Sequence, residues 1–144
     1  MFGERLDLAG TEHVARQAAR LVRPGDTILL RGPLGAGKTA FARAFIRTLA
    51  DDKNLDVPSP SFTLVQTYDT AAGLVHHLDL WRIAGPSDLN ELGWDDLLRD
   101  VVLVEWPERL VSRRPDDALE VAFHVNQDGT RTLRITGWND RWPR

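Results

Sequence analysis

Residues 32–39 read Gly-Pro-Leu-Gly-Ala-Gly-Lys-Thr, which matches the phosphate-loop pattern G-x-x-x-x-G-K-[ST] over its whole length. An apolar stretch at residues 27–30 precedes the motif, and a segment with helical spacing of apolar residues, 40–49, follows it. A strand, a glycine-rich loop and a helix in this order are the context that the motif requires. The sequence therefore predicts a P-loop nucleotide-binding domain.

The residues of this loop suit the binding of a polyphosphate. Its glycines allow the backbone to curl with N–H groups pointing inward, and the N-terminus of the following helix adds positive potential. Lys38 is predicted to reach the β- and γ-phosphates, and the Thr39 hydroxyl is predicted to coordinate Mg²⁺. The predicted nucleotide-binding positions of the motif are Gly35, Ala36, Gly37, Lys38, Thr39 and Ala40.

The bulk composition is that of an ordinary globular domain. The chain has 144 residues, of which 42% are hydrophobic and 27% charged, and it has no cysteine. These values predict a single domain, residues 1–144, and exclude disulfides and thiol catalysis. No apolar run is long enough to span a membrane and no signal-peptide pattern is present, so the expected location is cytoplasmic. A net charge of −3 argues against a stand-alone nucleic-acid binder.

Apolar spacing and turn residues predict an α/β domain around the motif. A short strand is expected at residues 5–8, followed by a helix that Thr11 caps. The apolar run at residues 101–104 predicts a buried parallel strand. Two hairpins are predicted, with strands at residues 63–68 and 74–80 and at residues 118–125 and 132–136. The expected architecture is a P-loop NTPase-like domain of three layers with a central mixed, partly parallel sheet.

Two acidic residues are candidates for the chemistry that a phosphate loop alone does not supply. Glu105 directly follows the run 101–104, at the carboxyl end of a predicted parallel strand, where ligand crevices form in open α/β sheets. It is the expected Mg²⁺-associated acid, although a solvated glutamate at a strand end gives the same pattern. Asp79 interrupts an apolar strand and is expected to bind metal or to position water. Of the two adjacent histidines, His77 shares the strand face of Asp79 and is expected to line the site.

Two further features leave alternatives open. Ser59, Ser61 and Thr63 place hydroxyls at alternate positions of a proline-containing loop, which could close on the γ-phosphate or could reflect ordinary turn chemistry. Trp106 follows Glu105 and could stack on a ligand or belong to core packing.

Five short sequence blocks follow one another along the chain from the phosphate loop to Glu108. They read GPLGAGKT at 32–39, VPSPSFTL at 57–64, HLDLWRI at 77–83, ELG at 91–93 and VEWPE at 104–108. Together they resemble the TsaE (YjeE) family of bacterial P-loop ATPases. The phosphate loop alone is generic, whereas its combination with the later blocks is specific.

The resemblance implies a function that spacing alone does not supply. The family is the ATP-hydrolysing subunit of the bacterial machinery that makes N6-threonylcarbamoyladenosine (t6A) in tRNA, with the transferase subunit TsaD and the scaffold TsaB as partners. It implies ATP and Mg²⁺ as cofactors and contact with tRNA only through the complex. It also implies that ATP hydrolysis is slow in the isolated chain, is stimulated by the partners and supports multiple turnover.

The resemblance also assigns residues. It implies Lys38, Asp79 and Glu105 as catalytic residues, with Glu105 joined by Thr39 at the metal. The family places a Thr and an Arg near the nucleotide, and the matching positions in this chain are Thr11 and Arg131. The departures from the family pattern are Pro33, Ser61 and Trp81, which stand where the family has Asp, Thr and Tyr.

Two other functions compete with the ATPase. A small-molecule kinase would need lid arginines, for which the sequence offers only Arg113 and Arg114, a pair better explained as solvated charges. A nucleotide-gated binding module would use ATP occupancy to control assembly, with hydrolysis incidental.

Overall fold

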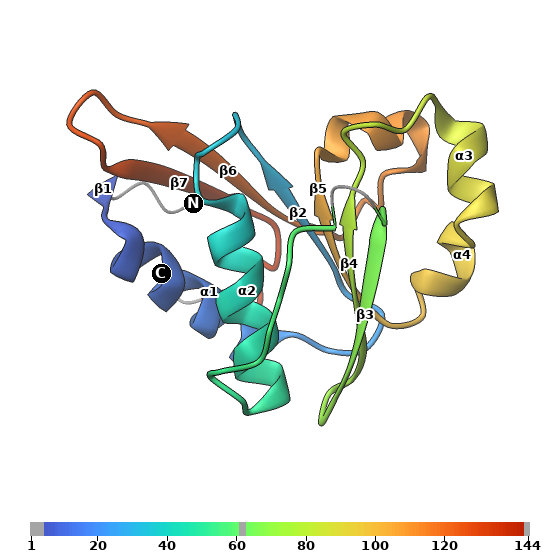
Figure 1. Cartoon of the computed structure of the whole chain (residues 1–144), viewed down its shortest axis with the longest axis horizontal. Coiled ribbons are helices and arrows are strands. Elements are labelled where there is room, and N and C mark those ends of the chain that lie inside the picture. Colours follow the sequence, from blue (N-terminus) through green and yellow to red (C-terminus); the bar gives the residue numbers. More distant parts are fainter. Residues whose placement is uncertain (1–4, 61–62, 143–144) are drawn as a thin grey trace.

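The computed structural model describes residues 5–60 and 63–142. Among these residues, seven strands form one sheet in the order β1-β7-β6-β2-β5-β4-β3 (Figure 1). The strands are β1 (Arg5–Leu6), β2 (Thr27–Arg31), β3 (Val65–Thr70), β4 (Gly73–Asp79), β5 (Val101–Glu105), β6 (Leu119–Val125) and β7 (Arg131–Thr136). The helices are α1 (Leu8–Leu21), α2 (Lys38–Ala50), α3 (Pro86–Glu91), α4 (Trp94–Leu97) and the 3₁₀ segment η1 (Pro107–Arg113).

The sheet is mixed, as the sequence predicts. Strand β2 lies at its centre and pairs in parallel with both β5 and β6, and β5 pairs in parallel with β4. The two predicted hairpins, β3–β4 and β6–β7, add antiparallel pairs, and β1 pairs with β7. The predicted α/β fold class with a partly parallel sheet is therefore confirmed.

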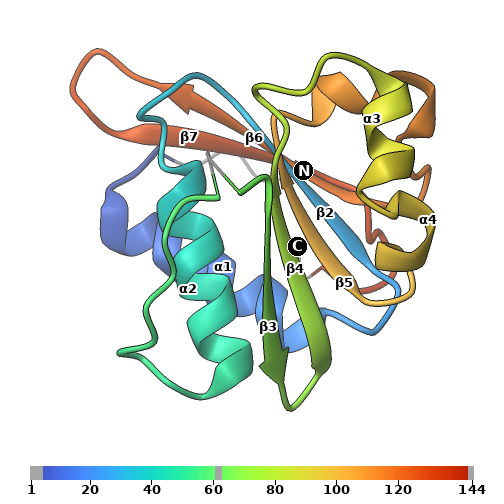
Figure 2. The same ribbon diagram turned by 45° about the vertical axis from the view of Figure 1, so that its right-hand side comes forward.

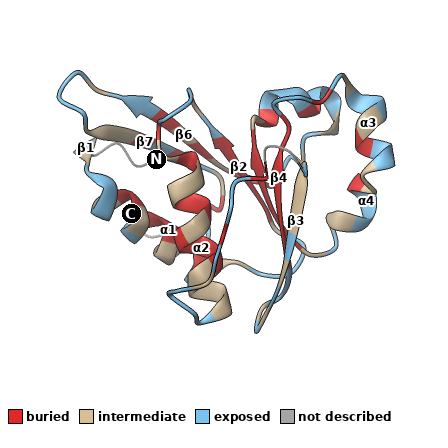
Figure 3. Cartoon of the chain, viewed as in Figure 1, coloured by how far each residue is buried: buried red, intermediate tan, exposed pale blue. Residues whose placement is uncertain are grey.

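Helices cover the parallel strands on both faces (Figures 1 and 2). On one face, α1 and α2 bury Val14, Phe41 and Phe45 against the sheet. On the other face, the segment from α3 to η1 contributes Leu89 and Trp94 to a second core cluster. Because both faces are covered, β5 is buried along its whole length, as Figure 3 shows.

The N-terminal elements differ in detail from the sequence prediction. Helix α1 begins at Leu8, and Asp7 is its N-cap because its side chain accepts a hydrogen bond from the Gly10 N–H at 2.8 Å. The prediction that Thr11 caps this helix is wrong: Thr11 lies one turn inside α1 and is buried. The preceding strand is correspondingly shorter than the predicted residues 5–8. The sequence offers two N-cap residues four positions apart, and the expected strand at residues 5–8 assigns Asp7 to the strand instead.

The segment after β7 folds back onto the start of β2. The Arg141 guanidinium donates to both carboxylate oxygens of Asp26, at 2.7 and 3.1 Å, and to the Leu21 carbonyl at 3.0 Å. Its charged group also lies 4.2 Å from the centre of the Trp138 ring. The C-terminal residues therefore fasten the turn between α1 and β2. Within the described residues, no helix combines the length and the apolar character that crossing a membrane requires.

Candidate functional site

Three neighbouring strands bring the predicted acidic residues to one edge of the sheet. In the register, Glu105 of β5 lies beside Leu30 of β2 on one side and Asp79 of β4 on the other. The phosphate loop begins just after Leu30, so both carboxylates lie next to it. A cavity of about 320 Å³ opens there; its lining is Leu8, Leu34, Gly35, Gly37, Lys38, Thr39, Ala40, Ser59, Asp79, Glu105, Trp106 and Arg131.

The phosphate loop has the backbone that the motif predicts. Gly35 and Gly37 have φ angles of +76° and +106°, and Gly37 is the N-cap of α2. Such angles favour glycine because a Cβ would be strained there. Helix α2 begins at Lys38, which confirms the predicted order of strand, loop and helix. The first turn of α2 lines the cavity, and the backbone N–H groups of a first helical turn have no partner within the helix.

Lys38 is buried beside the two carboxylates. Its ammonium donates to the Gly32 carbonyl at 2.5 Å and lies 3.6 Å from the centre of the Trp106 ring. Burial lowers the pKa of Lys38 below its ordinary value, and the nearby charges of Glu105, Glu108 and Asp79 oppose this shift. The ammonium is thus a poorly solvated cation at the place where the motif predicts the outer phosphates of a nucleotide.

Glu105 is held by contacts from two directions. The Thr39 hydroxyl, from the first turn of α2, lies 3.3 and 3.4 Å from its two carboxylate oxygens. The ring Nε2 of His77 lies 2.7 Å from Glu105 Oε2, and both side chains are buried. The predicted metal pair, Thr39 and Glu105, is therefore brought together, and His77 lies behind it.

Asp79 ends β4 in the neighbouring position. It is buried, it lines the cavity, and its Oδ1 accepts a hydrogen bond from the Trp81 backbone N–H at 3.0 Å. This contact fixes the turn after β4. Ser59 also lines the cavity, whereas Thr63 lies outside the lining and accepts from Gln66. The predicted hydroxyl at Ser61 lies outside the described residues.

Arg131 contacts the loop itself. From the start of β7, its side chain donates to the Ala36 carbonyl at 3.2 Å and to the Gly35 carbonyl at 3.0 Å. Arg131 thus lines the cavity and also donates hydrogen bonds to two carbonyls of the loop. These two bonds direct the carbonyls toward Arg131, which helps the loop to turn N–H groups toward the cavity.

Thr11 lies beneath the loop rather than in the cavity lining. It is 1% exposed, and among the described residues its hydroxyl has no hydrogen-bond partner. A Cβ built on Gly37 would lie 3.9 Å from Thr11 Cγ2, so the two residues are close neighbours. Ala36 is fully buried at the same place.

The cavity lining includes one tryptophan and two leucines: Trp106, Leu8 and Leu34. Trp106 has a left-handed backbone, φ 61°, which is uncommon for a residue other than glycine and turns the chain directly after β5. Its ring lies 4.4 Å from that of Trp81, which is 45% exposed. Leu8 and Leu34 were not predicted as site residues; both are exposed and line the cavity. The sequence offered one indication for Leu34, which is an apolar residue at a variable position of the phosphate-loop motif.

The two arginines considered for a kinase lid have partners outside the cavity. Arg113 bonds to Asn90 and Asp95, and Arg114 bonds to Glu120; neither arginine lines the cavity. The feature that a kinase would need is therefore not found at these two positions.

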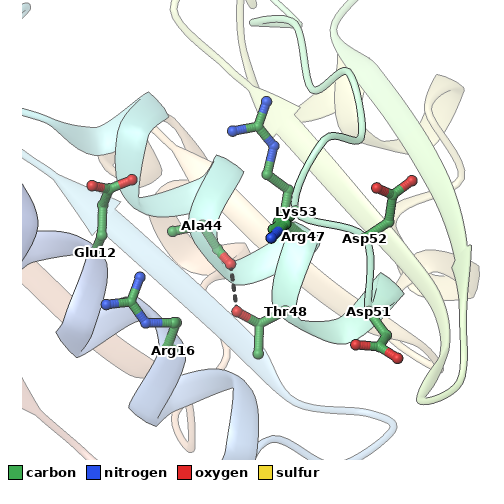
Figure 4. Close-up of a pocket in the computed structure, with 8 residues that line it drawn as sticks. All are labelled: Glu12, Arg16, Ala44, Arg47, Thr48, Asp51, Asp52 and Lys53. Carbon is green, nitrogen blue, oxygen red and sulfur yellow. Dashed lines mark hydrogen bonds between the residues drawn. The ribbon is translucent and has the colours of Figure 1, made fainter.

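A second, larger cavity lies away from this chemistry (Figure 4). Its volume is about 490 Å³, and its walls come from α1, from the C-terminal half of α2 and from residues 51–53, which follow α2. The polar groups around it are mixed in sign and partly or fully exposed, and the Thr48 hydroxyl is bonded to the Ala44 carbonyl of its own helix. The phosphate loop is at the opposite end of α2, so we place the candidate site in the smaller cavity.

The residues of the smaller cavity fit Mg²⁺ bound together with a phosphate. Among the described residues, no group of three or more His, Asp or Glu side chains could hold a metal ion alone. Thr39 and Glu105 offer oxygen donors within 3.4 Å of each other. Mg²⁺ prefers oxygen donors, and it is commonly held by one or two protein carboxylates plus substrate phosphates.

Comparisons with known proteins agree on one family. The family model of threonylcarbamoyl adenosine biosynthesis protein TsaE matches residues 6–133. A Rickettsia felis protein named tRNA threonylcarbamoyladenosine biosynthesis protein TsaE is 35% identical over 87% of this chain and 73% of its own length. The Bacillus subtilis protein of the same name is 30% identical over 92% and 82%. The crystal structure of Bacillus subtilis YdiB superposes with a TM-score of 0.74 and 24% identity, covering 97% of this chain and 90% of that one.

Proposed function

The chain belongs to the TsaE family of threonylcarbamoyl adenosine biosynthesis proteins, and from this premise we propose that it binds and hydrolyses ATP as a subunit of the t6A pathway. Family membership supports the pathway. The proposal of an ATPase rests on the cavity beside the phosphate loop.

The observation that carries the proposal is the convergence of Lys38, Thr39 and Glu105. A lysine whose charge is poorly solvated, a hydroxyl and a carboxylate meet at the N-terminus of a helix and beside a glycine-rich loop. This arrangement gives a polyphosphate positive potential and gives a divalent cation oxygen ligands. Phosphoryl transfer depends mainly on such positioning and charge stabilisation.

Each residue has a distinct role in this proposal. When bound, ATP would supply the phosphoanhydride bond that is broken, and Mg²⁺ would neutralise part of the charge on the phosphate oxygens. Lys38 balances phosphate charge, and Thr39 with Glu105 provides the metal ligands. Asp79 adjoins Glu105 in the register and is suited to orient a water by accepting its hydrogen bond. Arg131 holds the carbonyls of the loop away from the phosphates.

The isolated chain is expected to hydrolyse ATP slowly. Asp79 and Ser59 line the cavity, and a partner surface would complete the site beside them. We propose that a TsaD-like transferase and a TsaB-like scaffold provide this surface and that hydrolysis supports repeated rounds of modification. With a net charge of −3, the chain is expected to meet tRNA through that complex.

The test is ATP hydrolysis by the purified chain, alone and with TsaD and TsaB from the same source. We expect strong stimulation by the partners and loss of most activity in Lys38→Ala, because the charge opposite the phosphates is removed. Lys53→Ala is the matched control, since Lys53 is exposed in the turn that follows the C-terminal end of α2. Equal activity of Lys38→Ala and the control would contradict the proposal.

A second experiment separates hydrolysis from simple occupancy. The assay follows tRNA modification over many turnovers with ATP or with a saturating non-hydrolysable analogue. If ATP hydrolysis is required, repeated tRNA modification should stop when the analogue occupies the site of this subunit. Continued turnover would identify a nucleotide-gated binding module instead.

A further inference from the structure

His77 makes a buried contact with the proposed metal ligand that the roles assigned above do not use. Its side chain is fully buried in β4, on the sheet face that α2 covers, and its Nε2 lies 2.7 Å from Glu105 Oε2. Thr39 approaches the same carboxylate from α2. Glu105 is therefore held between the interior of the sheet and the first turn of the helix.

The chemistry of the two groups sets the direction of this hydrogen bond. An ionised carboxylate only accepts, so the ring Nε2 of His77 must carry the proton and donate. Among the described residues, the ring Nδ1 is buried and has no partner. With the proton on Nε2, the ring leaves only the acceptor Nδ1 without a partner. With the proton on Nδ1, the ring would bury an unpaired donor and would also lose the bond to Glu105, which costs more. The contacts thus favour one tautomer.

This bond limits how the carboxylate can turn. A carboxylate has about four lone-pair directions, and His77 occupies one of them on Oε2. The remaining directions are left for Thr39 and for the cavity. Carboxylates that bind metals are commonly hydrogen-bonded in this way, and the partner that orients them affects metal affinity.

His76 shows what a structural histidine looks like in the same strand. It is 5% exposed and faces the other side of the sheet, and both of its ring nitrogens have partners at 2.8 Å, Thr67 Oγ1 and Asp100 Oδ2. It joins β4 to Thr67 and Asp100, and it does not line the cavity. His77 differs because, within the described part of the chain, its ring has a single hydrogen-bond partner, Glu105, and Glu105 lines the cavity.

We propose that His77 is a positioning residue: its Nε2–H fixes the Glu105 carboxylate toward Thr39, and in this way it sets the affinity for Mg²⁺ rather than the affinity for the nucleotide. The inference rests on the proposed function, in which Thr39 and Glu105 are the metal ligands. It predicts that loss of the donor uncouples metal binding from nucleotide binding.

The test is the affinity for ADP, measured by calorimetry with Mg²⁺ and with EDTA. We expect His77→Met to lower the gain in affinity that Mg²⁺ provides by about 10- to 100-fold, the range for lost partners of metal ligands. Its affinity for ADP in EDTA should stay within about 2-fold of the unchanged chain, because no phosphate contact is removed. His77→Gln should restore most of the Mg²⁺ effect, since its amide N–H can take the place of Nε2–H. His76→Gln is the matched control and should lower the melting temperature while leaving the Mg²⁺ effect intact.

A second measurement does not depend on a variant that folds. The ring ¹⁵N shifts of His77 in the unchanged, nucleotide-free chain should show the proton on Nε2. An unprotonated Nε2, or a His77→Met variant whose Mg²⁺ effect is intact, overturns the inference and leaves the proposed function standing. Equal losses of affinity with and without Mg²⁺ would also overturn it, as they indicate a purely structural role. Failure of the unchanged chain to bind ADP at all would overturn both.

Discussion

At the scale of single residues, Lys38 is placed where stability and binding oppose each other. Burial lowers its pKa, which means that the folded protein disfavours the charged form more than the unfolded chain does. The attraction of Glu105, Glu108 and Asp79 only reduces this cost. A phosphate that binds beside the ammonium would add negative charge close to it and offset the cost of burial. Lys38 would therefore stabilise a phosphate-bound state more than the empty one.

We expect Lys38→Met to raise the free energy of unfolding of the nucleotide-free protein at pH 7. Lys38 is charged in both states below its folded pKa, so the burial cost is complete there. As the pH rises from the folded pKa to the ordinary lysine pKa of 10.5, the unfolded chain binds more protons and stability rises, so the advantage of Lys38→Met should shrink. Chemical denaturation from pH 7 to pH 10 measures this, with exposed Lys53→Met as the control. A less stable Lys38→Met at pH 7 would refute it.

The residues predicted from sequence and those missed differ in one respect. Lys38 and Thr39 follow from a local motif, and Glu105 follows from its position at the end of an apolar run, so neighbouring residues sufficed to predict them. The bond from His77 to Glu105 depends on the register between β4 and β5, which the local sequence does not determine. The wrong cap at Thr11 has a local cause, because Asp7 competes with it as an N-cap.

At the scale of elements, the segment after β7 stabilises the entry to the central strand. Arg141 joins the carboxylate of Asp26, just before β2, to the last residue of α1. Each partner in the ion pair is 14% exposed, so water and salt screen the pair less than they screen a surface pair. The apolar periods of β2 and β5 could be predicted from sequence, whereas this contact could not, because 115 positions separate its partners.

Arg141→Ala is expected to lower the free energy of unfolding by about 1–3 kcal/mol, since hydrogen bonds to a partly buried carboxylate are lost. Arg99→Ala is the matched control: Arg99 faces Asp96 at 3.9 Å with both side chains more than 80% exposed, and such pairs contribute about 0–1 kcal/mol. Urea denaturation gives both values. Equal losses in the free energy of unfolding would show that the contact between Arg141 and Asp26 stabilises the fold no more than a surface ion pair does.

At the scale of the whole molecule, the candidate site joins parts of the chain from both halves of the sheet. Its walls come from the loop before α2, the ends of β4 and β5 and the start of β7. A ligand that contacts all of these segments should stabilise the folded state as a unit. The sequence could predict the segments but not the identity of Leu8 as a wall residue, which depends on how α1 packs.

Saturating ADP with Mg²⁺ is therefore expected to stabilise the folded protein, by about 2.7 kcal/mol at a ligand concentration 100-fold above Kd. Thr39→Ala should remove most of the part that depends on Mg²⁺. Thr48→Ala is the control on the same helix, because the Thr48 hydroxyl is bonded within α2 at its other end. Thermal unfolding with and without EDTA separates the two parts, and an equal response of both variants would contradict the metal role of Thr39.

The contacts of the phosphate loop also affect the order of events during protein synthesis. A Cβ on Gly32 would lie 2.9 Å from the Phe123 carbonyl, and Arg131 bonds to carbonyls 95 and 96 positions earlier in the chain. The ribosome makes the loop long before it makes the two residues that shape it. A growing chain therefore carries the complete motif before its pocket can form, and the loop can take its folded shape only after Phe123 and Arg131 have been made.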